Sequence, residues 1–226
     1  MRWQAGIGLA ILVAIALAVW APSVIVERQM ATALRAHVDP DGWVRVRARA
    51  TAWGLAQQRI ERVHIEAAAI RLGDLVADRL TANLSGVQFV RSPGGWAPAR
   101  VRSGEAVAEI GRAQLERFLR ERGVEQPEVL VEPSGVTVNA AMPAGAVRVP
   151  VRLRGQFQAS GRDLRFRVAS LEVSGAELPQ PLADTLIGLA QPVISLRRLP
   201  IPLVVDRVST EGGRVIVWAR VEEGAP

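Results

Sequence analysis

The chain has no cysteine, no lysine and no tyrosine, and only four of its 226 residues are phenylalanine. The lack of cysteine excludes disulfides, zinc–thiolate sites, cysteine nucleophiles and a lipid-modified cysteine. The apolar half of the composition is mostly Ala, Val, Leu and Ile, which fill volume without offering a hydrogen bond. We expect one main domain whose core contains few polar groups.

Catalytic motifs are also missing. The sequence contains no nucleophile elbow, zinc-protease motif, Walker A loop or dinucleotide fingerprint. His64 shares a polar strand face with Arg62 and Glu66, which favours a solvated histidine, and His37 suits the end of a helix. The two carboxylates of residues 39–42 lie beside Pro and Gly, which indicates a turn rather than a calcium site. We therefore predict that the protein is not an enzyme and uses no metal or cofactor.

The formal charge is +6, and arginine supplies every basic side chain except the two histidines. Complete use of arginine is typical of a GC-rich genome, although arginine also suits bidentate contacts to phosphate. A basic chain fits anionic lipid headgroups, cell-wall polymers or nucleic acid. Because the arginines are spread through alternating segments without a nucleic-acid motif, we predict an anionic membrane lipid, such as a phospholipid, as the partner. A protein partner is left open.

An uninterrupted apolar run extends from Ala5 to Ala21 and continues to residue 26. At 1.5 Å per residue, about 20 helical residues span the roughly 30 Å of a bilayer's hydrocarbon core. We predict a single-pass anchor or uncleaved signal over residues 1–26, with a cleavable signal peptide as the alternative. Arg2 precedes the run while Arg28 and Arg35 follow it, so charge does not decide the orientation. The extreme N-terminal position favours the cell membrane, with the body of the protein outside the cytoplasm.

Apolar and polar residues alternate from Trp43 onward, which is typical of antiparallel strands with one buried face. Turn sequences rich in Gly, Pro and Asp separate the alternating segments. The apolar positions change parity near Gly104 and after Val168, which predicts β-bulges or strong curvature. We expect about nine strands in one large sheet. The clearest alternating segments are residues 43–53, 63–67, 80–84, 136–142 and 147–157.

Helical periodicity occurs over residues 111–122 and 181–190 of the body, and over 27–37 after the apolar run. Two body helices cannot cover the apolar face of such a sheet, which must curl on itself, dimerise or hold a ligand. The predicted fold is α+β, with a long, curved, mainly antiparallel sheet wrapping one or two helices. This outline is similar to that of tubular lipid-binding domains.

Many positions on the predicted inner face are small. Two interpretations stay open: the small residues let the helices pack closely, or they leave an elongated apolar groove for acyl chains. The small inward residues are Ala48, Ala50, Ala52, Ala82, Ala106, Ala108, Ala140 and Gly155.

Residues 177–217 combine the apolar helix, a Leu-Pro-Ile-Pro corner and a hairpin turned by Gly212-Gly213. Almost no side chain there is suited to acid, base or nucleophilic chemistry. The pair Arg197-Arg198 lies beside this apolar surface, where it suits a lipid phosphate or, alternatively, a solvated loop. The predicted lipid-binding residues are Leu182, Leu186, Leu189, Ile194, Leu199, Phe157, Phe166, Arg197 and Arg198.

Six short motifs follow one another along the chain: Gly54-Leu55, Leu84-Ser85-Gly86-Val87, Ser103-Gly104-Glu105-Ala106, Leu178-Pro179, Leu199-Pro200 and Gly212-Gly213. In order and spacing they resemble the LmeA-like phospholipid-binding family of bacterial envelope proteins. The resemblance covers roughly residues 23–221. It implies an extracytoplasmic protein, anchored or secreted, that binds phospholipid and supports the cell envelope, and it brings no catalytic residues.

The predicted organisation is an anchor or signal over residues 1–26, one lipid-binding domain over 27–222 and a tail over 223–226. The predicted function is non-catalytic binding of phospholipid, with acyl chains in an apolar groove. The alternative is a structural or interaction module whose apolar sheet face is covered by a partner subunit or by the membrane surface. An enzyme acting on envelope lipids or glycans would need a cluster of buried polar groups that the sequence does not indicate.

Overall fold

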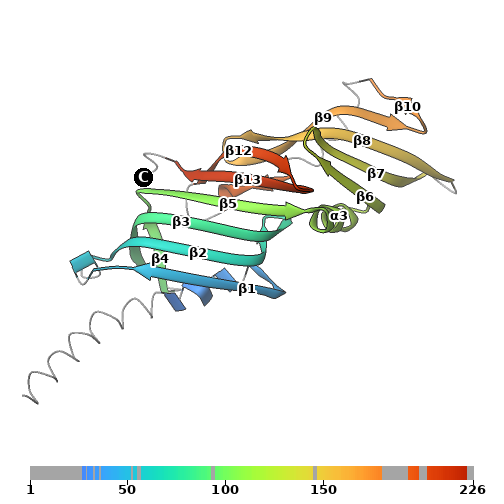
Figure 1. Ribbon diagram of the computed structural model, residues 1–226. Helices are drawn as coiled ribbons and strands as arrows, with labels where there is room; N and C mark the ends of the chain where they lie inside the picture. The colour runs from blue at the N-terminus through green and yellow to red at the C-terminus, as the bar shows by residue number, and fades with distance from the viewer. Residues whose placement is uncertain are drawn as a thin grey trace, which may run out of the picture.

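Antiparallel strands in two sheets make up most of the part of the protein described by the computed structural model (Figure 1). No helix within this part is both long enough and apolar enough to cross a bilayer. The predicted anchor, the predicted helix at 181–190 and the tail lie outside it. The described residues are 27–28, 30–32, 34–35, 37–51, 53–54, 57–92, 95–144, 147–179, 193–198 and 203–222.

The first sheet has the strand order β1-β2-β3-β5-β13-β12, and β4 pairs with the far end of β3. Its first four long strands are consecutive in the sequence apart from β4, while β13 and β12 return from the end of the chain to pair beside β5. The strands are β1 (Val38–Arg49), β2 (Arg59–Leu72), β3 (Leu75–Ser92), β4 (Gly95–Arg100), β5 (Ser103–Gly111), β12 (Leu203–Glu211) and β13 (Arg214–Val221).

The second sheet has the order β10-β9-β8-β7-β6, with the short β11 pairing beside β9. The prediction of a single large sheet is therefore wrong, because alternation reports which face of a strand is buried and not which strand it pairs with. The strands are β6 (Glu125–Glu132), β7 (Gly135–Ala144), β8 (Val147–Ser160), β9 (Asp163–Val173), β10 (Ala176–Glu177) and β11 (Ile194–Ser195).

The helix α3 (Arg112–Glu121) lies where the two sheets meet and confirms the helix predicted at 111–122 (Figure 1). Its apolar face buries Leu115 and Phe118 against the strands around it. On the other side, the carboxylate of Glu116 accepts hydrogen bonds from the Arg112 guanidinium and from the backbone N–H of Val129 in β6. The bond from Val129 connects the helix to β6 of the second sheet, while the bond from Arg112 lies within the helix.

Three further helical segments are described, of which Trp53 and Gly54 form the shortest. The described residues between 27 and 35 are helical, and Met30 and Leu34 pack against the core, as the sequence predicts. A single turn of 3₁₀ helix, η1 (Leu196–Arg198), follows β11.

The predicted strand faces and irregularities are confirmed in β1, β8 and β9. In β1, Val46 is buried while its neighbours Arg45 and Arg47 are exposed. The register between β8 and β9 shifts where the sequence changes parity: Gly155 pairs with Val168, but the preceding residue of β8 pairs with Ser170. Residues 39–42, predicted as a turn, instead form an irregularity within β1.

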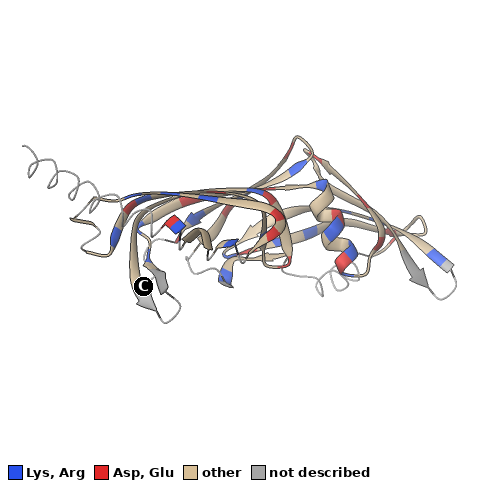
Figure 2. Ribbon diagram, turned by 90° about the horizontal axis from the view of Figure 1, so that it is seen from below, with Lys and Arg blue, Asp and Glu red and all other residues tan. Residues whose placement is uncertain are grey.

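The molecule is elongated, and the first sheet is arched when seen edge-on (Figure 2). Charged residues of both signs are spread along its length (Figure 2). β12 lies between the two sheets, since it pairs with β13 on one side and packs against β8 on the other. The core therefore continues from the inner face of the first sheet to the start of the second sheet.

Candidate functional site

A row of alanines crosses the centre of the first sheet on its inner face. Ala82 of β3 lies opposite Ala106 of β5, which lies opposite Ala219 of β13. Each is nearly inaccessible to solvent. Because side chains on one face of neighbouring strands stand side by side, three methyl groups here leave space above the sheet that larger residues would fill. The alternation of apolar and polar residues along these strands places this face toward the core.

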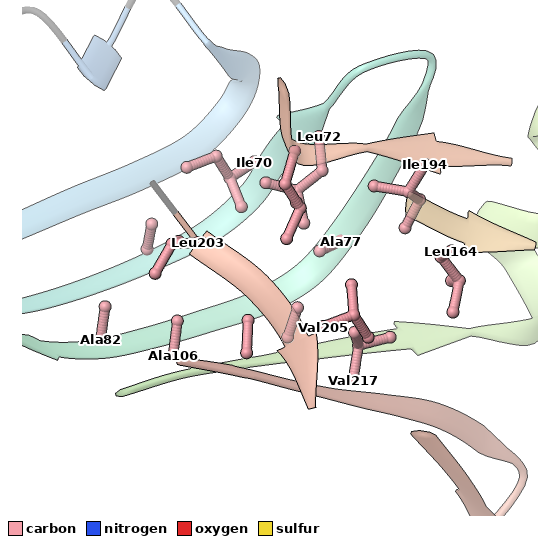
Figure 3. Packing of buried hydrophobic residues seen from close by; sticks show 14 of the residues in the cluster. Ile70, Leu72, Ala77, Ala82, Ala106, Leu164, Ile194, Leu203, Val205 and Val217 are labelled. Atoms are coloured by element: carbon pink, nitrogen blue, oxygen red, sulfur yellow. The ribbon is translucent and has the colours of Figure 1, made fainter. Parts of the chain in front are cut away.

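The segment formed by β11 and η1, residues 193–198, passes close to the β2–β3 turn at Gly73 and contributes Ile194 and Leu196 to the boundary of this space, and we call it the strap. Ile194 points from the strap toward the first sheet, together with Leu164 of β9 and Val205 of β12 (Figure 3), and Leu196 of the strap lines the same space. All four are buried. The space is thus bounded by the first sheet on one side and by the strap, β9 and β12 on the other.

Hydrogen bonds from the turn before β9 hold the strap in place. The backbone N–H of Leu196 donates to the carbonyl of Arg162 at 2.8 Å, and that of Val193 donates to the carbonyl of Leu164 at 3.0 Å. The guanidinium of Arg162 reaches back to the carbonyl oxygens of Leu196 at 3.2 Å and of Leu203 at 3.3 Å. One arginine therefore connects the strap to the beginning of β12.

These elements line a partly open cavity of about 230 Å³. Sixteen of the eighteen described residues that line it are apolar, so the cavity offers almost no partner for a polar ligand. The apolar lining consists of Leu34, Ile65, Ile70, Leu72, Leu80, Ala82, Leu84, Ala106, Ala108, Leu164, Ile194, Leu196, Leu203, Val205, Val217 and Ala219.

The two polar lining residues, His37 and Arg71, lie together. The backbone N–H of Arg71 donates to the carbonyl of His37 at 2.7 Å. The Arg71 guanidinium is 3.1 Å from Asp39, whose other oxygen is 2.9 Å from the Arg117 guanidinium. Because Arg71 is near the end of β2 while Leu84 and Leu203 are on the opposite side of the alanine row, the cavity has one polar end and one apolar end.

Asp163 is the buried charged residue of the described part, and its partners indicate a structural role. Its carboxylate accepts hydrogen bonds from the Ser195 hydroxyl at 2.8 Å and from the Arg197 guanidinium at 3.2 Å. The hydrogen bond from Arg197 is the main cause that lowers the pKa of Asp163, and the Ser195 hydroxyl acts in the same direction against burial. A carboxylate kept ionised in this way is a poor proton donor or acceptor near neutral pH.

The other acid–base candidate is on the outer face of the first sheet. His64 lies 2.6 Å from the Asn83 side chain and 3.2 Å from Glu66, and its hydrogen bond lowers the pKa of Glu66. This pair points away from the cavity, since Val63 and Ile65 on either side of His64 are buried. Among the described residues, no group of three or more His, Asp or Glu side chains is arranged to hold a metal ion.

Comparison with known proteins gives one match. A family model for LmeA-like phospholipid-binding proteins matches residues 17–220, which is most of the chain. The chain belongs to the LmeA-like phospholipid-binding family. This confirms the resemblance seen in the sequence motifs, and the family's description names lipid binding and no catalysis. No curated protein and no solved structure matches this LmeA-like chain.

The predicted lipid-binding residues of this LmeA-like protein fall in three places. Ile194 lines the cavity. Phe157 and Phe166 form an edge-to-face pair in the second sheet, with ring centroids 5.1 Å apart, outside the described lining. Arg197 is two-thirds exposed and holds Asp163, so its contact with a phosphate stays a prediction. Outside the described part lie Leu182, Leu186, Leu189, Leu199 and the side chain of Arg198.

Several lining residues of the LmeA-like cavity were not predicted as site residues. Ala82, Ala106 and Ala108 are among the small inward positions that the sequence singles out, and they do line the cavity. Leu164 and Leu196 carry no such signal, because a leucine that covers a cavity and one that fills a core look alike in sequence. His37 and Arg71 come together only through the pairing of β1 with β2.

Proposed function

We propose that this LmeA-like protein is a membrane-anchored, extracytoplasmic and non-catalytic phospholipid-binding protein of the cell envelope. An acyl segment of the lipid lies over the alanine row, and the phosphate lies near His37 and Arg71. The observation that carries the proposal is the cavity, with sixteen apolar lining residues and two polar residues, His37 and Arg71, at one end. This polarity matches that of a phospholipid, which has a long apolar part and a single charged end.

The cavity volume limits how much of a lipid is enclosed. An engineered apolar cavity of about 150 Å³ takes one benzene, so 230 Å³ corresponds to an acyl segment of roughly ten carbons. At about 0.8 kcal/mol per buried methylene, such a segment recovers about 8 kcal/mol. Removing two sixteen-carbon chains from a bilayer costs on the order of 24 kcal/mol on the same scale. Within the described residues, the cavity suits one gripped segment rather than a wholly enclosed lipid.

Two arginine positions compete for the phosphate. Arg71 is at the cavity's polar end and shares Asp39 with Arg117, which leaves this cluster with more positive than negative charge. Arg197 is on the strap, with its guanidinium partly occupied by Asp163. We favour Arg71, because it lines the cavity itself. Arg71→Gln is expected to weaken phospholipid binding about tenfold, and Arg197→Gln serves as the comparison.

A paired substitution on β5 tests the proposal. Ala106 faces the cavity, whereas the next residue, Val107, faces the opposite side of the sheet. The full chain, extracted in mild detergent, is analysed by native mass spectrometry for bound phospholipid. Ala106→Phe is expected to lower the bound fraction at least tenfold, while Val107→Phe leaves it unchanged.

Thermal unfolding of both variants checks that each is folded. If the Ala106→Phe protein is folded and binds phospholipid as well as the wild type, the cavity is not the binding site. A protein partner that co-purifies in place of lipid supports the interaction module instead.

A further inference from the structure

Two arginines are directly opposite each other at one end of the first sheet. Arg49, the last residue of β1, pairs in register with Arg62 of β2, and both are exposed on the outer face. Like charges at facing positions of an antiparallel pair destabilise the sheet. Within the described part of the chain, neither arginine forms an ion pair with a carboxylate. The two guanidiniums therefore repel each other, and the nearby carboxylate of Glu61 accepts a hydrogen bond from the Thr51 hydroxyl rather than from either of them.

The same face is balanced elsewhere. Four residues earlier in β1, Arg45 is opposite Glu66 and forms an ion pair with it at 3.8 Å. Farther across the sheet, Arg214 pairs with Glu109 of the neighbouring strand. The unbalanced pair thus belongs to the end of the sheet and is not a general property of its outer face.

A third arginine extends the unbalanced row. Arg62 is opposite Ser85 of β3, and the Ser85 carbonyl accepts a hydrogen bond from the backbone N–H of Arg102. Arg102 is exposed, and its stem lies over Gly86, where a Cβ would be 2.9 Å from that of Arg102. Arg102 also lacks an ion pair with any described carboxylate. Three arginines therefore extend across β1, β2 and the start of β5.

An exposed tryptophan is at the same end. Trp53 follows β1 after a short loop and has 73% of its surface exposed. Two hydrogen bonds connect described residues on either side of Trp53: the Thr51 hydroxyl accepts one from the Gly54 N–H, and the Trp53 carbonyl accepts one from the Gln57 N–H. An amphipathic indole ring beside cationic side chains is typical of proteins that lie at the headgroup level of a membrane.

The chain also enters the domain at this end. The carboxylate of Glu27 accepts a hydrogen bond from the backbone N–H of Ala48 at 2.7 Å, one residue before Arg49. Residues 1–26, which the sequence predicts to be a membrane anchor, end immediately before Glu27. The ends of β1 and β13 and the starts of β2 and β5 are all at this end of the molecule (Figure 1).

We infer that the surface formed by Arg49, Trp53, Arg62 and Arg102, which we name the Trp–Arg edge, docks on an anionic lipid bilayer. The arginines meet lipid phosphates, and the Trp53 ring enters the headgroup layer. The inference rests on the proposed membrane anchoring, and it is independent of the cavity.

Docking at this edge also sets the orientation of a bound lipid. The polar end of the cavity, at Arg71, is roughly 30 Å along β2 from Arg62 of the Trp–Arg edge. A lipid in the cavity would therefore keep its phosphate away from the bilayer and its acyl chain toward it. This is the orientation that lipids have in the leaflet beneath, so a lipid could be raised into the cavity without turning over.

Because the chain has no cysteine, one introduced cysteine gives a unique labelling site. We would place a spin label at Gln57→Cys, which is exposed beside Trp53, and in a second protein at Ser134→Cys, an exposed position in the turn after β6. Each full chain is reconstituted in vesicles of 30% phosphatidylglycerol and 70% phosphatidylcholine. The label at 57 is expected to collide at least fivefold less often with a water-soluble relaxation agent than the label at 134.

Charge reversal tests the role of the arginines. In the Gln57→Cys protein, Arg49→Glu, Arg62→Glu and Arg102→Glu together should restore access of the water-soluble agent, as should vesicles of phosphatidylcholine alone. The matched control is Arg154→Glu, Arg165→Glu and Arg167→Glu, which changes the net charge equally at exposed positions of the second sheet. In this control protein, the label at residue 57 should stay protected from the water-soluble relaxation agent. Trp53→Ser replaces the triple variant if the latter does not fold.

Two results would overturn the inference. One is a label at 57 that is as accessible to water as the label at 134 in anionic vesicles. The other is protection that persists unchanged after reversal of the three arginines or in neutral vesicles. Ala106→Phe should not alter the protection, so failure of the cavity and failure of the docking edge are distinguishable.

Discussion

At the scale of single residues, the small side chains of the inner face matter most. Ala82, Ala106 and Ala219 stand in register on three neighbouring strands, and larger residues there would close the space beneath the strap. Cavities that are apolar and dry retain affinity for apolar ligands, because no water hydrogen bonds have to be broken on binding. Three methyl groups in one row therefore do more for the proposed function than any charged residue of the site.

Asp163 shows how a buried charge stabilises the strap without taking part in chemistry. It holds Ser195 and Arg197, and both bonds favour its ionised form. Since its pKa is lower in the folded than in the unfolded chain, Asp163 stabilises the fold above its ordinary pKa. That contribution is lost as the pH falls through the folded-state value.

Asp163→Asn should remove this pH-dependent contribution. We expect the free energy of unfolding at pH 7 to fall by about 1–2 kcal/mol, because the charge-assisted hydrogen bonds from Ser195 and Arg197 to the carboxylate are lost. The share of this loss that comes from Arg197 is small, since its guanidinium is exposed to solvent. The difference should shrink as the pH falls below about 4 and vanish only below the folded-state pKa of Asp163, where the carboxyl is protonated in both states of the wild type. Denaturant titrations between pH 3 and 7 measure this, and a constant difference across that range would contradict it.

At the scale of elements, the strap is the part whose movement would open the cavity. It is short and is held at its two ends by the turn at residues 161–164. Short segments held by a few hydrogen bonds open at lower free energy than the sheets around them. We therefore expect lipid entry and release to involve this segment.

Arg162→Ala should loosen the strap, because the guanidinium bonds to Leu196 and Leu203 are lost. Backbone amide exchange at Leu196 and Val205 is expected to become faster by at least tenfold, and bound phospholipid should exchange faster. Arg165→Ala is the matched control, since Arg165 is exposed in the same strand region without an ion pair among the described residues. Equal exchange in both variants would show that Arg162 does not hold the strap.

Many elements could be predicted from the sequence, because local patterns determine them. The helix at 111–122, the hairpin at Gly212-Gly213 and the bulge after Val168 are each confirmed. The pairing partners could not be predicted in the same way. The strands β12 and β13 return to lie beside β5, and β13 pairs with it. This pairing joins residues about a hundred positions apart, and the alternation of apolar and polar residues contains no information about such partners.

At the scale of the whole molecule, the predicted site was partly identified. The small inner face was recognised, but its position under the strap depends on the meeting of two sheets where one was expected. The polar end could not be predicted, because His37 and Arg71 are far apart in the sequence and neither carries a motif. The family, in contrast, was recognisable from the order of short motifs.

The whole molecule is organised along its length if both proposals hold. The Trp–Arg edge and the point where residues 1–26 join the domain are at one end of the first sheet, and the polar end of the cavity is at the other end of β2. The acyl segment then lies between the membrane and the phosphate site. The arched sheet acts as a wall along which one chain of the lipid extends.

The most direct test of the central claim is to map where an acyl chain lies. The full chain is placed in nanodiscs with a phospholipid that carries a photoreactive diazirine within roughly the first ten carbons of one acyl chain, and adducts are located by mass spectrometry. We predict adducts on cavity-lining residues such as Ala82, Ala106 and Leu196, and their loss in the Ala106→Phe variant but not in Val107→Phe. Adducts confined to residues 1–26 and the outer face of the first sheet would contradict the claim that the cavity holds lipid.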